Sequence, residues 1–128
     1  MAYSLDRLFP DTTMDEADAR IRAALAADGF GVLTQIDVQA TMKAKLDKDL
    51  PGYRILGACQ PQMAFRALSA SPRIGVMMPC NVILREVDGG VEASAVDLTA
   101  SWGQLGDPEL AEIAATLRAR LSAVLEAA

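Results

Sequence analysis

Residues 81–96 read NVILREVDGGVEASAV, and this stretch predicts a β-hairpin. The turn falls at residues 88–90, where aspartate and glycine tolerate the positive φ that a tight turn requires. On either side, residues 81–87 and 91–96 are rich in valine and other apolar residues, which is typical of strands. We therefore expect a sheet that contains this hairpin.

Helices and strands are expected to alternate before the hairpin. Thr13 and Glu16 have the Thr-x-x-Glu spacing of a capping box, in which each side chain satisfies a backbone donor of the other residue. Pro61 and Pro108 suit the first position of a helix, where a missing N–H has no partner to lose. Besides the hairpin, the expected strands are 1–9, 30–38, 53–58 and 74–78, and the expected helices are 13–29, 40–49, 61–69 and 108–125.

The last expected helix has the clearest amphipathic pattern in the chain. Its apolar stripe consists of Leu110, Ile113, Ala114, Leu117, Leu121, Val124 and Leu125. The order of elements is βαβαβα, then a hairpin, then a helix. This order predicts an α+β fold with a mixed sheet and with helices packed mainly on one face.

The composition indicates one globular domain that spans residues 1–128. Apolar residues make up 52% of the chain and charged residues 23%, which supports a core and excludes disorder. The net charge of −5 does not provide the basic surface that nucleic-acid binding requires, so we expect no nucleic-acid partner. No run approaches the roughly 18 apolar residues of a membrane-spanning helix, so we expect no membrane partner.

Histidine is absent, which removes several kinds of catalytic and metal site. Ser-His-Asp and Cys-His catalysis, His-ligated zinc and a proximal-His haem all need this residue. No other catalytic constellation is recognisable, so the sequence gives no ground to expect an enzyme. The amino terminus shows no secretory signal and the two cysteines lack CxxC spacing, which together predict a cytoplasmic protein with reduced thiols.

The two cysteines are the residues most open to a chemical role. Cys59 directly precedes Gln60 and Pro61, so it lies at the start of an expected helix, where free N–H groups favour a thiolate. Cys80 follows Pro79, which cannot donate to a sheet ladder and often marks a bulge or an edge. Three interpretations stay open: two small buried hydrophobic residues, one shared thiol, metal or ligand site, or a disulfide.

Methionine adds the hypothesis of a soft-metal site. Met63, Met77 and Met78 lie near the cysteines in the sequence, and thiolate and thioether ligands select Cu(I). The alternative is that these methionines fill gaps in the core. Trp102 lies in a loop of small residues, and we expect it either to cover the domain's own core or to anchor a subunit or ligand contact.

Three blocks of sequence, residues 29–38, 53–61 and 74–82, resemble the bacterial and archaeal family called domain of unknown function 302. They read GFGVLTQIDV, YRILGACQP and IGVMMPCNV. The resemblance extends over nearly the whole chain, and it implies a small α+β fold that is usually a homodimer, without a settled activity. Two positions depart from the family pattern: Gln60 stands where the family usually has asparagine, and Leu98 stands where proline is common.

We interpret the protein as a small homodimeric binding module with a candidate ligand or soft-metal site, where two thiols and two amides come together. The alternatives are a thiol-redox or sulfur-handling protein that uses Cys59 and Cys80, and a haem or copper carrier. The sequence does not identify the ligand or any cofactor. The candidate site residues are Cys59, Gln60, Pro61, Pro79, Cys80 and Asn81.

Two geometric expectations follow from this interpretation. Self-association is expected through sheet edges or through the apolar last helix, because edge strands need to be covered. Cys59 and Cys80 are expected to approach each other, because successive strands of a βαβ unit usually lie side by side and their corresponding ends come close.

Overall fold

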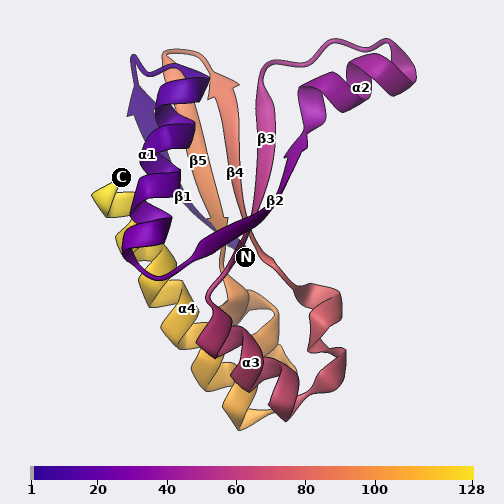
Figure 1. The fold of residues 1–128 in the computed structure, drawn as a ribbon, viewed down its shortest axis with the longest axis vertical. Helices are drawn as coiled ribbons and strands as arrows, with labels where there is room; N and C mark the ends of the chain where they lie inside the picture. Colours follow the sequence, from indigo (N-terminus) through magenta and orange to yellow (C-terminus); the bar gives the residue numbers. More distant parts are fainter. Residues whose placement is uncertain (1) are drawn as a thin grey trace.

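The computed structural model describes residues 2–128, and a five-stranded sheet lies at its centre (Figure 1). The strands are β1 (Ser4–Pro10), β2 (Gly31–Asp37), β3 (Tyr53–Cys59), β4 (Cys80–Val87) and β5 (Gly90–Val96). The helices are α1 (Met14–Ala27), α2 (Val38–Leu46), α3 (Pro61–Ala70) and α4 (Pro108–Ala127), with the short 3-10 helices η1 (Pro72–Met77), η2 (Leu98–Ala100) and η3 (Trp102–Gln104). The strand order is β1-β5-β4-β3-β2, and each neighbouring pair is antiparallel.

The predicted α+β domain is confirmed, but its sheet is antiparallel rather than mixed. A parallel pair needs a crossover that carries the chain back along the face of the sheet. Here α2 extends beyond one end of β2 and β3, and α3 lies beyond the opposite end of the sheet (Figure 1). Each of these connections returns the chain to the sheet at the end that it has just left, so the next strand runs in the reverse direction.

The segment predicted as a strand over residues 74–78 belongs mostly to η1 instead. Its backbone makes a local turn, in which the N–H of Ile74 donates to the carbonyl of Ser71. Ile74 is buried, whereas Val76 is 89% exposed. The apolar composition predicted a strand wrongly because this segment has no neighbouring strand to pair with. It connects the end of α3 to the start of β4.

The predicted hairpin is confirmed. Strands β4 and β5 pair as far as Val87 and Gly90, around the turn at residues 88–89. Gly90 must be glycine, because a Cβ at this position would lie 2.1 Å from the carbonyl oxygen of Phe9 in the adjacent β1. The first strand begins at Ser4, and residue 1 of the expected strand lies outside the described residues.

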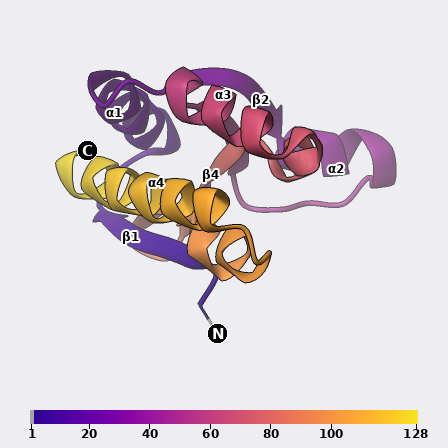
Figure 2. The same ribbon diagram turned by 90° about the horizontal axis from the view of Figure 1, so that it is seen from below.

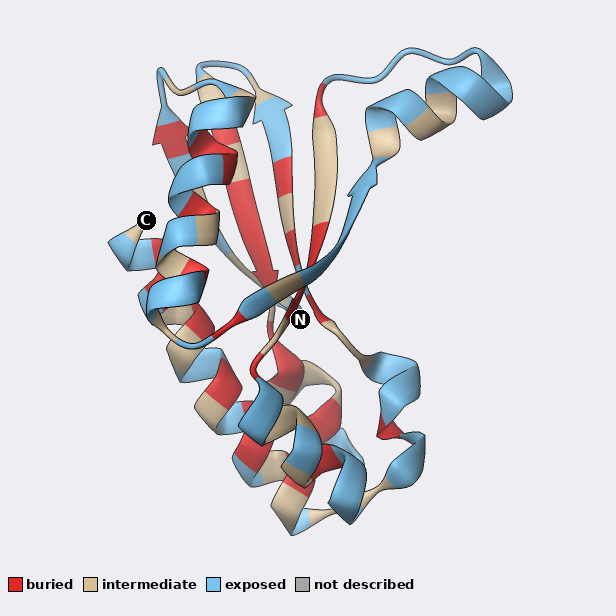
Figure 3. Ribbon diagram, viewed as in Figure 1, coloured by how far each residue is buried: buried red, intermediate tan, exposed pale blue. Residues whose placement is uncertain are grey.

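Helices α1 and α4 pack on one face of the sheet, and the main core lies between them and the strands (Figure 2). The predicted apolar stripe of the last helix is confirmed, since each of its seven residues is buried in α4. Helix α2 differs: it buries none of its residues and projects from the body (Figure 3). None of the helices within residues 2–128 combines the length and the apolar character needed to cross a membrane.

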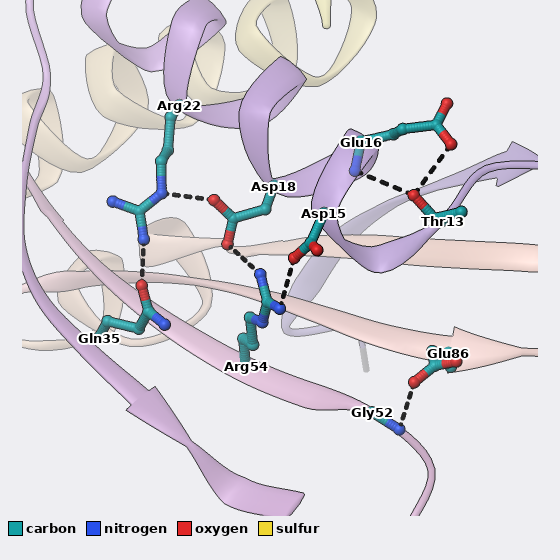
Figure 4. A network of polar contacts seen from close by, with 9 residues as sticks. All are labelled: Thr13, Asp15, Glu16, Asp18, Arg22, Gln35, Gly52, Arg54 and Glu86. Atoms are coloured by element: carbon teal, nitrogen blue, oxygen red, sulfur yellow. Dashed lines mark hydrogen bonds and ion pairs between the residues drawn. The ribbon is translucent and has the colours of Figure 1, made fainter.

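Charged side chains connect α1 to β2 and β3 on the same face of the sheet (Figure 4). Arg54 of β3 donates to Asp18 at 2.9 Å and to Asp15 at 2.8 Å, and both acceptors belong to α1. Arg22 of α1 donates to Asp18 and to Gln35 of β2. Asp18 is only 8% exposed, so its buried charge depends on these two guanidinium groups.

Candidate functional site

The candidate site lies where the end of β3 meets the start of β4. Ala58 and Cys80 are direct partners across this pair, and Cys59 follows Ala58. The two cysteines approach each other as expected, but not for the expected reason. Parallel strands would place the end of β3 and the start of β4 at opposite ends of the sheet, whereas antiparallel pairing places them at the same end.

A cavity of about 20 Å³ occupies this junction. A volume above about 10–15 Å³ is enough for one water molecule, and an ion fits in the same space. Pockets for organic ligands are roughly 300–1,000 Å³, so this cavity does not admit a haem or a similar molecule in the present conformation. Its lining residues are Ala58, Cys59, Gln60, Ala64, Met78, Pro79, Cys80, Trp102 and Leu117.

Most of the residues predicted for the site line this cavity, namely Cys59, Gln60, Pro79 and Cys80. Pro61 is outside the lining, because it occupies the first turn of α3 and is exposed. Asn81 is also outside it: alternation along β4 turns this side chain to the face opposite that of Cys80, beside Gly57. The structure therefore brings two thiols and one amide together, rather than two thiols and two amides.

Gln60 has a structural role next to the cavity. Its Oε1 accepts a hydrogen bond from the backbone N–H of Met63 at 2.8 Å, so Gln60 is the N-cap of α3. Glutamine here performs the capping role for which asparagine is a common choice. The side-chain oxygen of the one amide in the cavity lining is thus engaged by the protein backbone.

Burial controls the protonation of Cys80. This side chain is 7% exposed, and burial, with a smaller contribution from the charge of Cys59, raises its pKa from 9.0 to about 11. Cys80 is therefore a protonated thiol at neutral pH and a weak nucleophile. Cys59 is half-buried, and both cysteines are free thiols, so the disulfide interpretation finds no support.

Trp102 lines the cavity from η3 and is 1% exposed. It covers the domain's own core, which is one of the two roles expected for it. Its indole N–H has no hydrogen-bond partner among residues 2–128. A buried donor without an acceptor costs roughly 1–3 kcal/mol. No sequence signal connects Trp102 to the cysteines, since it reaches them through the packing of η3 on α4.

Of the three methionines considered for a soft-metal site, Met78 lines the cavity. Met77 is 40% exposed, and the sulfur of Met63 lies 3.8 Å from the guanidinium group of Arg66. Within residues 2–128, no three histidine, cysteine, aspartate or glutamate side chains are grouped so that they could hold a metal ion. Met78 places one thioether in the lining beside the two thiols.

Comparison with known proteins identifies the family. A family model described as "Domain of unknown function DUF302" matches residues 9–128. The chain belongs to the DUF302 family. This DUF302 protein is similar to the crystal structure of an uncharacterized conserved DUF302 protein from Bacillus stearothermophilus, with 30% sequence identity, 98% of each chain covered and a TM-score of 0.91. No curated protein matches it in sequence.

A larger hollow of about 500 Å³ lies between α1 and α4 of this DUF302 protein. Its walls are mostly alanine side chains, and Arg20, which lines it, donates to the carbonyl of Ala128. Arg20 and Asp28 are its charged lining residues, and the Oδ2 of Asp28 is buried without a hydrogen-bond partner among residues 2–128, but the lining contains no thiol. The small cavity between β3 and β4 is therefore the better candidate for chemistry.

Proposed function

We propose that this DUF302 protein is a small homodimeric binding module in which Cys59 and Cys80 together hold one soft centre. The observation that carries the proposal is that both thiols line a single cavity of about 20 Å³. Cysteine sulfur is a soft ligand, and two such groups at one small cavity favour a soft ion over an organic molecule.

The volume of the cavity distinguishes the haem-carrier hypothesis from the copper-carrier hypothesis, both of which the sequence left open. A haem requires a pocket of several hundred Å³ and an axial ligand, and this cavity is far smaller. A copper carrier requires only a few sulfur ligands around an ion. The donors at the junction support the copper alternative and not the haem alternative.

Thiol-redox chemistry has weaker support. In that hypothesis Cys59 attacks and Cys80 resolves the intermediate, so Cys80 must act as a thiolate. Burial and the charge of Cys59 raise the pKa of Cys80 to about 11, which keeps it protonated at neutral pH. A thiol that releases its proton to solvent only when a soft ion binds to its sulfur is better suited to metal binding than to redox turnover.

The residues around the thiols fix the positions of the backbone next to Cys59 and Cys80. Gln60 caps α3 and so fixes the point at which the chain leaves Cys59. Pro79 packs over Gly57: a Cβ at that glycine would lie 2.8 Å from the Cγ of Pro79 and 2.2 Å from the Oγ1 of Thr34. This close packing supports the position of the chain just before Cys80.

Native mass spectrometry with silver(I) tests the proposal, because silver(I) is a soft ion that undergoes no redox change here. We expect one ion per chain in the unmodified protein, and loss of that ion in both Cys59→Ser and Cys80→Ser. Elemental analysis and absorbance spectra of freshly purified protein would show whether a metal is already bound. Two independent ions per chain, or a single ion retained by either variant, would contradict a shared site.

The proposed homodimer uses a surface away from the thiol site, at an edge of the sheet. The last helix is not available for association, because its apolar stripe is buried in the core of its own chain. Strand β2 is an edge of the sheet. Two of its apolar side chains are exposed, Leu33 at 67% and Ile36 at 49%. An uncovered edge with apolar side chains is a template for pairing with a second copy.

Light scattering tests the dimer. We expect twice the monomer mass of 13.6 kDa at micromolar concentration, and the monomer mass for Ile36→Lys. Val76→Lys is the matched control, since Val76 is 89% exposed on η1, outside β2, and this change should leave the dimer intact. A monomer mass for the unmodified protein would count against the dimer but not against the thiol site.

A further inference from the structure

We propose that the soft centre is a copper(I) ion bound by three sulfurs: the Sγ atoms of Cys59 and Cys80 and the Sδ atom of Met78. This inference rests on the proposed function and names its ligand. The three residues line the same cavity and come from two neighbouring segments, the end of β3 and the turn into β4.

The donor set selects the class of metal. Hard cations such as magnesium and calcium take carboxylate and carbonyl oxygen ligands, and the cavity lining contains no carboxylate. The one side-chain amide oxygen in the lining belongs to Gln60 and accepts from Met63. Structural zinc takes four cysteine or histidine ligands, whereas two cysteines are present here. Thiolate and thioether sulfur together select copper(I).

Binding leaves one negative charge that the surroundings can stabilise. Each bond from copper to a cysteine sulfur replaces an S–H bond, and the proton leaves to solvent. The thioether of Met78 binds through a lone pair and releases nothing, and copper keeps its +1 state throughout. Two thiolates and one copper(I) therefore carry a net charge of −1.

Two features of the cavity favour that charge. Helix α3 begins at Pro61, directly after the N-cap Gln60, and the positive end of its dipole lies beside Cys59. The indole N–H of Trp102 has no partner among residues 2–128, and Trp102 lines the same cavity. A sulfur that carries negative charge supplies the acceptor that this buried donor lacks.

The test combines two measurements on the whole protein under anaerobic conditions. Competition with a chromophoric copper(I) chelator gives the affinity, and copper-edge X-ray absorption gives the number of sulfur neighbours. We expect three sulfurs in the unmodified protein. In Met78→Leu we expect two sulfurs and an affinity lower by about tenfold or more, comparable with the loss caused by removing an outer-shell partner.

Met77→Leu is the matched control, because Met77 is adjacent in sequence and lies outside the cavity lining. It should bind copper as the unmodified protein does. Selenomethionine labelling gives a second readout that needs no substitution: copper should gain one selenium neighbour. This measurement keeps the inference testable if Met78→Leu does not fold.

The outcomes separate the two claims. Two sulfurs, no selenium neighbour and an unchanged affinity in Met78→Leu would overturn the three-sulfur site, while a shared thiol site would stand. Failure of copper(I) to bind both thiols would overturn this inference, and failure of silver(I) as well would overturn the proposed function.

Discussion

At the amino end of β3, Arg54 is held by ion pairs of 2.8 Å to Asp15 and 2.9 Å to Asp18, whereas at the carboxyl end Cys59 borders an apolar cavity with a second thiol. The amino end of β3 contacts α1 through ion pairs, and the carboxyl end of β3 packs beside α3. At the charged end the groups satisfy one another. At the cavity end, both cysteines are free thiols and the indole N–H of Trp102 has no hydrogen-bond partner among residues 2–128.

This difference indicates which residues contribute only to stability and which contribute to both stability and ligand binding. The charged end is part of the framework, and a substitution there should change stability without changing ligand binding. The cavity end combines packing with one indole N–H that has no partner among residues 2–128, so substitutions there should change both stability and ligand binding.

Trp102→Ala should lower the free energy of unfolding by about 3–5 kcal/mol, the usual cost of removing a fully buried large aromatic side chain. Trp102 is 1% exposed and lines the cavity. Urea unfolding followed by circular dichroism measures the change, with Trp102→Phe as a control that keeps most of the packing. A loss below about 1 kcal/mol for the alanine variant would show that packing does not stabilise the cavity end.

Raising the pH should destabilise the protein through Cys80. Its pKa is about 11 when folded and near the ordinary value of 9.0 when unfolded. As pH rises above 9.0 the unfolded chain loses this proton first, so stability falls until about pH 11. The total is about 2–3 kcal/mol, at roughly 1.4 kcal/mol per pKa unit.

Cys80→Ala isolates this effect, because the other groups that titrate in alkali are common to both proteins. Unfolding by urea should lose less stability in the variant over the same pH range. Equal pH dependence in the two proteins would show that Cys80 is not a buried neutral thiol.

Arg54→Met should lower stability by about 1–2 kcal/mol. Breaking a buried ion pair costs about 3–5 kcal/mol, but Arg54 is 24% exposed in its side chain and water screens part of the effect. Arg22 still pairs with Asp18 in this variant, which limits the loss. A change in silver(I) stoichiometry in this variant would contradict the separation of the two ends.

Lys43→Ala should leave the thermal midpoint unchanged within error. Lys43 lies on α2, which buries none of its residues, and it pairs with Asp47 and Asp49 at the surface. Exposed pairs of this kind contribute little, because solvent screens them and both side chains lose entropy. A clear drop in the midpoint would show that α2 is stabilised by more than its visible contacts, as it would be in a dimer.

Local signals predicted much of the fold. The capping box at Thr13 is present in part, since the N–H of Glu16 donates to the Oγ1 of Thr13. Pro61 and Pro108 begin helices, and the hairpin turn is in its predicted place. Each of these features depends on residues a few positions apart, whose propensities act without the rest of the chain.

Features that depend on distant residues were not predictable in the same way. The direction of β4 relative to β3 depends on where α3 and η1 return the chain, and no local pattern states it. The same pairing decides that Asn81 turns away from Cys80, and the packing of η3 on α4 brings Trp102 to the cavity. The cysteines were identified from their own neighbours in sequence, but the rest of the site could be assembled only from the fold.

The anomalous scattering of copper in crystals of the copper(I)-loaded protein would locate the proposed three-sulfur site. We expect one strong copper peak per chain between the Sγ atoms of Cys59 and Cys80, bonded to both and to the Sδ atom of Met78. A peak on carboxylate groups, a peak bonded to one cysteine alone, or no peak at this junction would contradict it.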